Sequence, residues 1–180
     1  DNKKFHYLGL YLSLLAKLNI KIETKKHYLP FIPNSNNIFL NKKYLLFHLD
    51  KRWETFPLKV RDNLKRKITS LSYDNKIVVT SNIGCNSFYN FIKKKLLNSS
   101  NIEFYDEPTL DSIISLVYFS ETCISSHSGL IVHTAAAFNK KIIDIVHDEI
   151  FNELDRWVPF DTNYKRYNVQ NFLDESFKFA

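Results

Sequence analysis

The stretch TCISSHSGLIVHTAAAFNKKIIDIV, residues 122–146, decides the fold class of this chain of 180 residues. Its apolar start at 122–125 predicts a buried strand, 129–138 predicts a helix, and the β-branched segment 141–146 predicts a second strand. A strand, a helix and a second strand in this order form a right-handed unit with two parallel strands. Residues 122–146 therefore predict one βαβ unit.

The same alternation extends back along the chain to residue 44. The pattern predicts further strands at 44–49, 76–80 and 102–105, with helices at 58–71, 87–97 and 110–119. Short apolar strands separated by helices are typical of a parallel sheet that is covered on both faces. We expect an α/β, Rossmann-like three-layer sandwich with a mainly parallel sheet over residues 42–180. Its tail after Phe151 should hold a short helix followed by irregular chain.

Residues 1–41 do not follow this alternation. Apolar side chains at helical spacing predict an amphipathic helix at 4–18, and a segment rich in proline, asparagine and serine predicts a loop at 23–41. The chain begins with Asp1 and has no methionine, so we expect it to be a piece of a longer protein. Residues 1–41 would then link a missing N-terminal half to the domain at 42–180.

The composition excludes several classes of protein. With 44% hydrophobic and 24% charged residues, the chain belongs to the globular class, and it has no apolar run long enough to span a bilayer. Its two cysteines lack the spacing of a zinc site or a disulfide framework, so a reducing cytoplasm is expected. The net charge of +6 suits an anionic partner. No nucleic-acid-binding motif accompanies the basic residues. We therefore interpret them first as a solvated surface, second as a contact with an anionic membrane, and last as a nucleic-acid-binding surface.

The first candidate site is the predicted helix start that follows residue 125. Ser126, Ser128 and Gly129 would let a phosphate approach the free backbone N–H groups and the positive end of the helix dipole. Alternatively, the two serines only cap the helix. His127 could donate a hydrogen bond to a phosphate, more strongly when protonated, or could be satisfied by neighbouring backbone.

The second candidate site follows the strand predicted at 44–49. In a parallel sheet the carboxyl ends of the strands share one edge, so Lys51 and Arg52 would offer positive charge to a diphosphate near the helix start. His48 and Trp53 are interpreted as packing residues. Glu107, beyond a third strand, could accept hydrogen bonds from ribose hydroxyls, or it could only favour the next helix together with Asp106.

Together these segments resemble the C-terminal half of the heptosyltransferase-like glycosyltransferases, over most of residues 44–147. Lys51-Arg52-Trp53 resembles the family's Lys-x-Trp-Pro-type element. His127-Ser128-Gly129, with His133 and the alanines at 135–137, resembles its Asp-Thr-Gly-x-x-His-x-Ala-Ala-type element. The chain departs from the family in four places. His127 replaces the aspartate, His133 comes one residue late, the loop after the first strand is short and lacks hydroxyl residues before the lysine, and the segment 81–86 has no acid.

The resemblance implies the nucleotide-sugar-binding half of a GT-B glycosyltransferase that inverts configuration without a metal or another cofactor. The acceptor, a cell-surface saccharide such as lipopolysaccharide, and the catalytic base would belong to the missing N-terminal domain, so no catalytic residue is named. The protein would be cytoplasmic, at the inner face of the membrane. The alternative is a degenerate, non-catalytic module that binds a nucleotide or a sugar phosphate. The implied donor contacts are Lys51, Arg52, Ser126, His127, Ser128 and Gly129, with Glu107 and His133 near the ribose or sugar.

Overall fold

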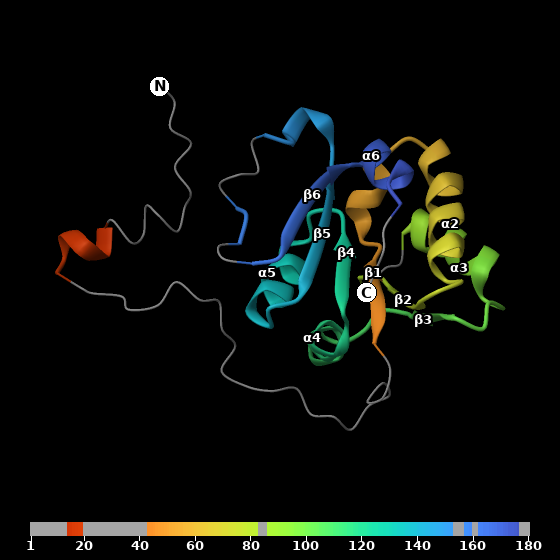
Figure 1. The fold of residues 1–180 in the computed structure, drawn as a ribbon, viewed down its shortest axis with the longest axis horizontal. Coiled ribbons are helices and arrows are strands. Elements are labelled where there is room, and N and C mark those ends of the chain that lie inside the picture. The colour runs from red at the N-terminus through yellow and green to blue at the C-terminus, as the bar shows by residue number, and fades with distance from the viewer. Residues whose placement is uncertain (1–13, 20–42, 83–85, 153–156, 160–161, 177–180) are drawn as a thin grey trace.

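The computed structural model describes residues 14–19, 43–82, 86–152, 157–159 and 162–176. Six strands form one sheet in the order β3-β2-β1-β4-β5-β6, and each neighbouring pair is parallel (Figure 1). The strands are β1 (Tyr44–His48), β2 (Lys76–Thr80), β3 (Ile102–Tyr105), β4 (Thr122–Ser125), β5 (Lys141–Val146) and β6 (Tyr164–Asn168). The expected α/β, Rossmann-like fold is confirmed.

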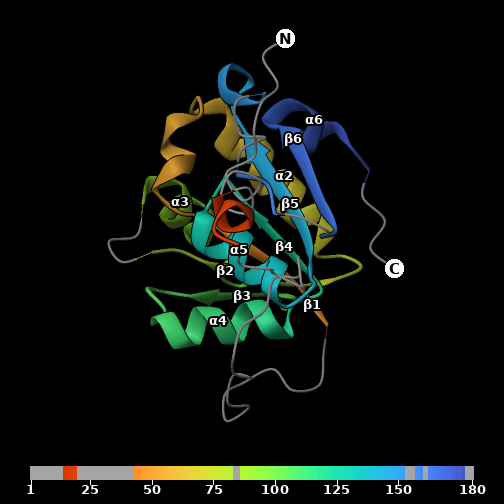
Figure 2. The ribbon, with the colours of Figure 1, turned by 90° about the vertical axis from the view of Figure 1, so that its left-hand side faces the viewer.

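The helices form a layer on each face of this sheet. Buried side chains of α2, α3 and α6 share one hydrophobic core, and those of α4 and α5 share the other. Figure 2 shows α4 and α5 together over one face of the sheet, where they contact each other. The helices are α2 (Lys59–Leu71), α3 (Ser87–Leu96), α4 (Leu110–Phe119), α5 (Gly129–Ala137) and α6 (Val169–Asp174), with 3-10 turns η1 (Lys51–Thr55) and η2 (Asp148–Ile150).

Strand β1 shows why the central strands are mainly apolar. Leu45 and Phe47 pack into the core under α2 and α3, while Tyr44 and Leu46 pack into the core under α4 and α5. Because successive side chains point to opposite faces, a strand covered on both sides buries neighbouring positions alike and is mainly apolar along its length. The sequence signal for buried parallel strands was therefore strong.

The expectation for the tail was wrong. Residues 164–168 form β6, which pairs in parallel with β5, and α6 follows directly. This edge strand carries Lys165 and Arg166 and is only partly buried, so its pattern lacked the apolar run of the other strands. Pairing with β5, rather than local sequence preference, accounts for its extended conformation.

Little of the expected N-terminal segment falls within the described residues. Residues 14–17 are helical, in agreement with the end of the helix expected at 4–18. The remainder of that helix and the loop expected at 23–41 lie outside the described residues. The described helices include none that is long and apolar enough to cross a membrane.

The order of the strands creates a switch point between β1 and β4. From β1 the chain moves outward through β2 to β3, then returns to β4 on the other side of β1 and continues through β5 to β6. The connections after β1 and β4 therefore leave the sheet in opposite directions. Ligands of open α/β sheets bind in the crevice at such a point, outside the carboxyl ends of the strands.

Candidate functional site

The two segments expected to bind a diphosphate leave the sheet at this switch point. His48 and Ser125 are the last residues of β1 and β4, and they are partners in the parallel register. Lys51 and Arg52 lie just beyond the first of these, and residues 126–129 lie just beyond the second. The fold thus brings the turn that contains Lys51 and Arg52, here called the cationic turn, next to the helix start at residues 126–129, on the same edge of the sheet.

The cationic turn holds its two basic residues differently. Asp50 caps η1 by accepting a hydrogen bond from the Arg52 backbone N–H at 3.0 Å, and its other oxygen pairs with the Arg52 guanidinium at 2.6 Å. Asp50 is buried, whereas the Arg52 side chain is half exposed. Lys51 is exposed and has no ion pair within the described part of the chain. Arg52 is therefore partly neutralised, and Lys51 is the stronger candidate for binding an anion.

Contacts from two strands fix the position of this turn. The buried Trp53 donates from Nε1 to the carbonyl oxygen of His48 at 3.0 Å, which confirms that Trp53 packs beneath the turn. The Thr55 hydroxyl donates to the Arg52 carbonyl oxygen and lies 2.6 Å from Nε2 of His147, the residue after β5. Because Thr55 uses its proton on that carbonyl, His147 is the donor to Thr55. His147 also stacks on Phe56, with ring centroids 4.1 Å apart.

A hollow of about 550 Å³ opens beside the turn. It is lined by Asp50, Lys51, Arg52, Glu54, Thr55 and Asn82, which come from the connections after β1 and β2. Glu54 is occupied there, since Oε1 accepts the Ser87 backbone N–H at 2.8 Å, and this hydrogen bond lowers the pKa of Glu54. The start of α5 does not line this hollow, so a ligand that contacts both segments must extend across the switch point.

The start of α5 has no side-chain cap. Ser128 occupies the N-cap position, is buried, and accepts no hydrogen bond from the helix, which contradicts the capping alternative for this residue. By contrast, Asn86, Thr109 and Asn168 each cap their helices. A Cβ atom added at Gly129 would meet no described atom within 4 Å other than its chain neighbours and the backbone of α5 itself. Gly129 is also exposed, so the start of α5 offers the open space that the approach of an anion requires.

His127 adopts a left-handed backbone conformation, with φ of 48°, just before this helix. Asp144 of β5 holds it there: one carboxylate oxygen accepts the His127 backbone N–H at 2.6 Å, and the other lies 2.9 Å from Nδ1 of the ring. Since a left-handed conformation is costly for a residue other than glycine, this clamp offsets the cost. The partner of His127 is thus a carboxylate and not the neighbouring backbone, and only Nε2 remains to face a ligand.

Asp144 was missed from the sequence. It is fully buried, and its carboxylate also accepts the hydroxyl of Tyr164 from β6 at 2.6 Å. Burial, together with the nearby carboxylate, raises the pKa of Tyr164, which therefore remains a neutral donor. One signal was available, since an acid inside the apolar segment 141–146 requires partners when that strand is buried.

Glu107 and His133 lie away from the switch point. Glu107 is exposed beyond β3, and β2 separates that strand from β1. Asp106 does not support α4 as proposed, because it accepts the Tyr89 hydroxyl and pairs with Lys93, both on α3. His133 is exposed on the second turn of α5. The structure does not gather these two residues with the other candidates.

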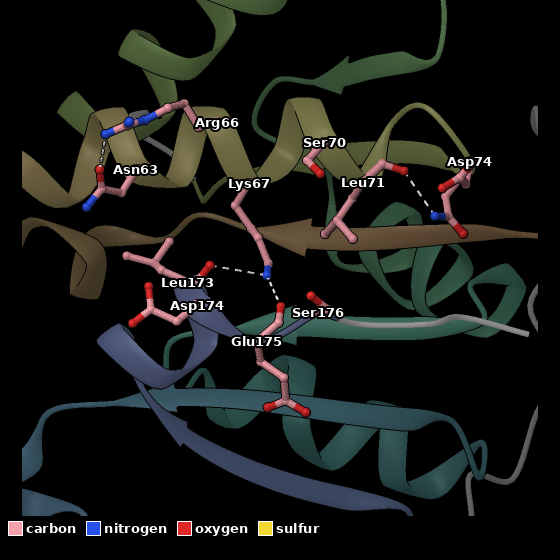
Figure 3. Close-up of a pocket in the computed structure, with 11 residues that line it drawn as sticks. Asn63, Arg66, Lys67, Ser70, Leu71, Asp74, Leu173, Asp174, Glu175 and Ser176 are labelled. Carbon is pink, nitrogen blue, oxygen red and sulfur yellow. Dashed lines mark hydrogen bonds between the residues drawn. The ribbon is translucent and has the colours of Figure 1, made fainter.

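A second hollow, of about 520 Å³, lies between α2 and the chain that follows α6 (Figure 3). The figure shows Lys67 extending from α2 toward two backbone carbonyl oxygens of the α6 segment. Its ammonium group donates to Leu173 at 3.3 Å and also to Glu175. Cations near the last carbonyls of a helix satisfy groups that have no partner within the helix. Lys67 therefore has a structural role here.

Within the described ranges, no cluster of histidine, cysteine, aspartate or glutamate side chains could hold a metal ion. No protein-family model matches the chain. No curated protein matches it either.

Solved structures do match. A glycosyl transferase family 9 protein from Veillonella parvula superposes with a TM-score of 0.66 at 10% identity, covering 95% of this chain and 51% of that chain. The E. coli heptosyltransferase WaaC with ADP-2-deoxy-2-fluoro heptose gives 0.53 at 15% identity, covering 74% and 39%. The UDP-GlcNAc 2-epimerase of Methanocaldococcus jannaschii gives 0.54 at 15% identity, covering 75% and 37%.

The chain thus spans about half or less of the length of these neighbours. At such low identity the likeness concerns the fold, and the expected structural likeness to heptosyltransferases is confirmed at that level. The chain therefore has the α/β, Rossmann-like fold that is found in heptosyltransferases and in a family 9 glycosyltransferase.

Proposed function

We propose that this chain is the donor-binding half of a glycosyltransferase and that it binds the diphosphate of a nucleotide sugar at the switch point. The observation that carries the proposal is the placement of Lys51 and the uncapped start of α5 beyond the neighbouring strands β1 and β4. A diphosphate bound between them would meet a cation on one side and backbone N–H groups on the other. Both types of group bind phosphate oxygens strongly.

The same arrangement would assist departure of the nucleoside diphosphate. As the bond from the sugar to the diphosphate breaks, negative charge grows on the leaving oxygens. The ammonium group of Lys51 and the preorganised N–H groups at the start of α5 would stabilise this charge. We propose an inverting reaction without a metal ion, in which the acceptor and the general base come from an N-terminal domain of a longer chain.

Such a reaction would take place in the cytoplasm, with a saccharide such as lipopolysaccharide as the acceptor. The net charge of +6 supports contact with an anionic membrane surface, since basic proteins are attracted to acidic lipids. This location and this acceptor rest entirely on the proposed transfer reaction.

Calorimetric titration of the chain with a panel of nucleoside diphosphates tests the site. We expect one diphosphate to bind, and Lys51→Ala to weaken its binding about tenfold or more, because hydrogen bonds to charged groups contribute about 1.5–3 kcal/mol. Arg52→Ala should have a smaller effect, because Asp50 already neutralises Arg52. Lys95→Ala, an exposed lysine in the last turn of α3, is the control for net charge. Unchanged affinity in Lys51→Ala would exclude this site.

A non-catalytic module that binds a nucleotide or a sugar phosphate remains the second candidate. Two contacts favour it, because Asp50 pairs with the Arg52 guanidinium and Asp144 holds the His127 ring, so neither side chain is fully available to a leaving group. The longer chain separates the two candidates. A transferase should release the nucleoside diphosphate when donor and acceptor are both present, whereas the module should bind the nucleotide without turnover.

A further inference from the structure

A row of three polar residues crosses the middle of the sheet at its carboxyl edge. Thr80, His48 and Ser125 end the neighbouring strands β2, β1 and β4, and each is in register with the next. The residue before each of them belongs to the core under α2 and α3 (Val79, Phe47 and Ile124). Because side chains alternate along a strand, the three polar side chains lie together on the face that α4 and α5 cover.

All three side chains are buried, and among the described residues none of their nitrogen or oxygen atoms makes a hydrogen bond that meets the geometric criteria, although Asn82 lies near the His48 ring. Their exposed fractions are 0% for Thr80, 1% for His48 and 1% for Ser125. Six buried side-chain nitrogen and oxygen atoms lack a partner among the described residues, and four of them belong to this row: both ring nitrogens of His48 and the two hydroxyl oxygens. Folded proteins rarely leave buried polar groups unpaired, so such a concentration requires a ligand or an ordered water molecule.

The three side chains suit an uncharged hydrogen-bonding partner. Burial lowers the pKa of His48 to about 4, so its imidazole is neutral at physiological pH, with one nitrogen as donor and the other as acceptor. Thr80 and Ser125 contribute hydroxyl groups that can also donate and accept. A partner that both donates and accepts hydrogen bonds without carrying charge fits this set, and a hydroxyl group has that property.

The row lies next to the proposed donor crevice. Asp50, Asn82 and Arg52 are all close enough to His48 to act on its pKa, although neither ring nitrogen makes a hydrogen bond of acceptable geometry. The same three residues line the hollow beside the cationic turn. His48 therefore lies near side chains that line that hollow.

We propose that His48, Thr80 and Ser125 form a binding site for a neutral hydroxyl group beneath the switch point. The hydroxyl belongs either to an ordered water molecule that stays in the fold or to the sugar part of a bound nucleotide. The second source rests on the proposed function, whereas the first does not.

Two variants remove one hydroxyl each with little change of shape: Thr80→Val and Ser125→Ala. Thr122→Val is the matched control, because Thr122 is buried and unpaired as well, but it begins β4 at the opposite edge of the sheet. Each variant is unfolded with denaturant in the absence of ligand. Each is also titrated with ADP, UDP and their glucose esters.

If water occupies the site, both row variants should raise the unfolding equilibrium constant about fivefold to thirtyfold relative to Thr122→Val, with unchanged affinity for the probes. If a sugar hydroxyl occupies it, the variants should unfold as the control does and bind the preferred probe about tenfold more weakly. Either result supports the site.

The proposal is overturned if both row variants are at least as stable as Thr122→Val and bind every probe as the wild type does. That result would show that the hydroxyl groups have no partner in either state. If the wild-type chain binds no probe at all, the proposed donor function fails, and the unfolding measurements still decide whether the row holds water.

Discussion

Replacing Gly129 with valine adds a branched side chain at the first position of α5, where the proposed diphosphate would approach the backbone. No described atom other than the chain neighbours and the backbone of α5 lies within 4 Å of the position that a Cβ would take. We therefore expect the substitution to cause no clash inside the protein. Gly129 has no positive φ that would strain another residue either. We expect the variant to fold as the wild type does and to obstruct only what binds from outside.

The expected magnitudes follow from this geometry. Replacing glycine at a position that tolerates a side chain reduces the entropy of the unfolded chain and stabilises the fold by about 0.4–1 kcal/mol. Since valine has a weaker helix propensity than alanine, Gly129→Ala should gain slightly more stability than Gly129→Val. Loss of the hydrogen bonds from the start of α5 to a charged phosphate should cost about 1.5–3 kcal/mol of binding, or roughly tenfold to 150-fold in affinity.

Thermal unfolding and calorimetric titration with the preferred nucleoside diphosphate, carried out on the same samples, give both quantities. We expect affinity to fall in the order wild type, Gly129→Ala, Gly129→Val, while stability stays equal or rises. Full affinity in Gly129→Val would refute a phosphate site at this helix start. A loss of stability would show instead that the space beside Gly129 is needed for folding.

Three further substitutions test how the structure is held together. Asp144→Ala should lower the free energy of unfolding by about 3 kcal/mol in denaturant, because it deprives three partly buried donors of their buried acceptor. Asp148→Ala, on the exposed turn η2, should change it by less than about 0.5 kcal/mol. The pKa of His48 is about 6.5 in the unfolded chain and about 4 in the folded chain, because burial lowers it. The free energy of unfolding should therefore fall on acidification, by about 2 kcal/mol from pH 7 to pH 5. His48→Leu should abolish that part of the pH dependence. Lys67→Met should lower the free energy of unfolding by about 1 kcal/mol, because the carbonyl groups at the end of α6 lose their donor. Lys59→Met, at an exposed position of α2, should leave the free energy of unfolding nearly unchanged. Equal effects of the two substitutions would rule out the capping role of Lys67.

The left-handed turn at His127 bears on the choice between a transferase and a binding module. The resemblance to heptosyltransferases implies an aspartate at this position, and here a histidine stands there whose ring and backbone N–H are held by Asp144 from the next strand. A carboxylate therefore still lies beside the helix start, although it comes from β5. This arrangement keeps the turn rigid, which suits the binding of a phosphate in either candidate function.

The first five strands and the helices between them were predictable because their signal is local. An apolar segment such as 76–80 can satisfy its backbone and bury its side chains on both faces only in the middle of a covered sheet, so its pattern identifies it. The edge strand β6 was missed for the opposite reason. Its residues are polar and half exposed, and only the free edge of β5 makes them a strand.

The sequence by itself determined the parallel α/β sheet and the two segments that flank its switch point, because hydrophobic period, β-branched residues and helix-start residues act over a few positions. Only the tertiary structure decided which polar groups meet: that Asp50 partly neutralises Arg52, that Asp144 holds His127, and that the buried His48 lies between Thr80 and Ser125. Pairing of this kind depends on strand order and register. Those are set by how the whole chain buries its apolar surface, and no short stretch of sequence contains that information.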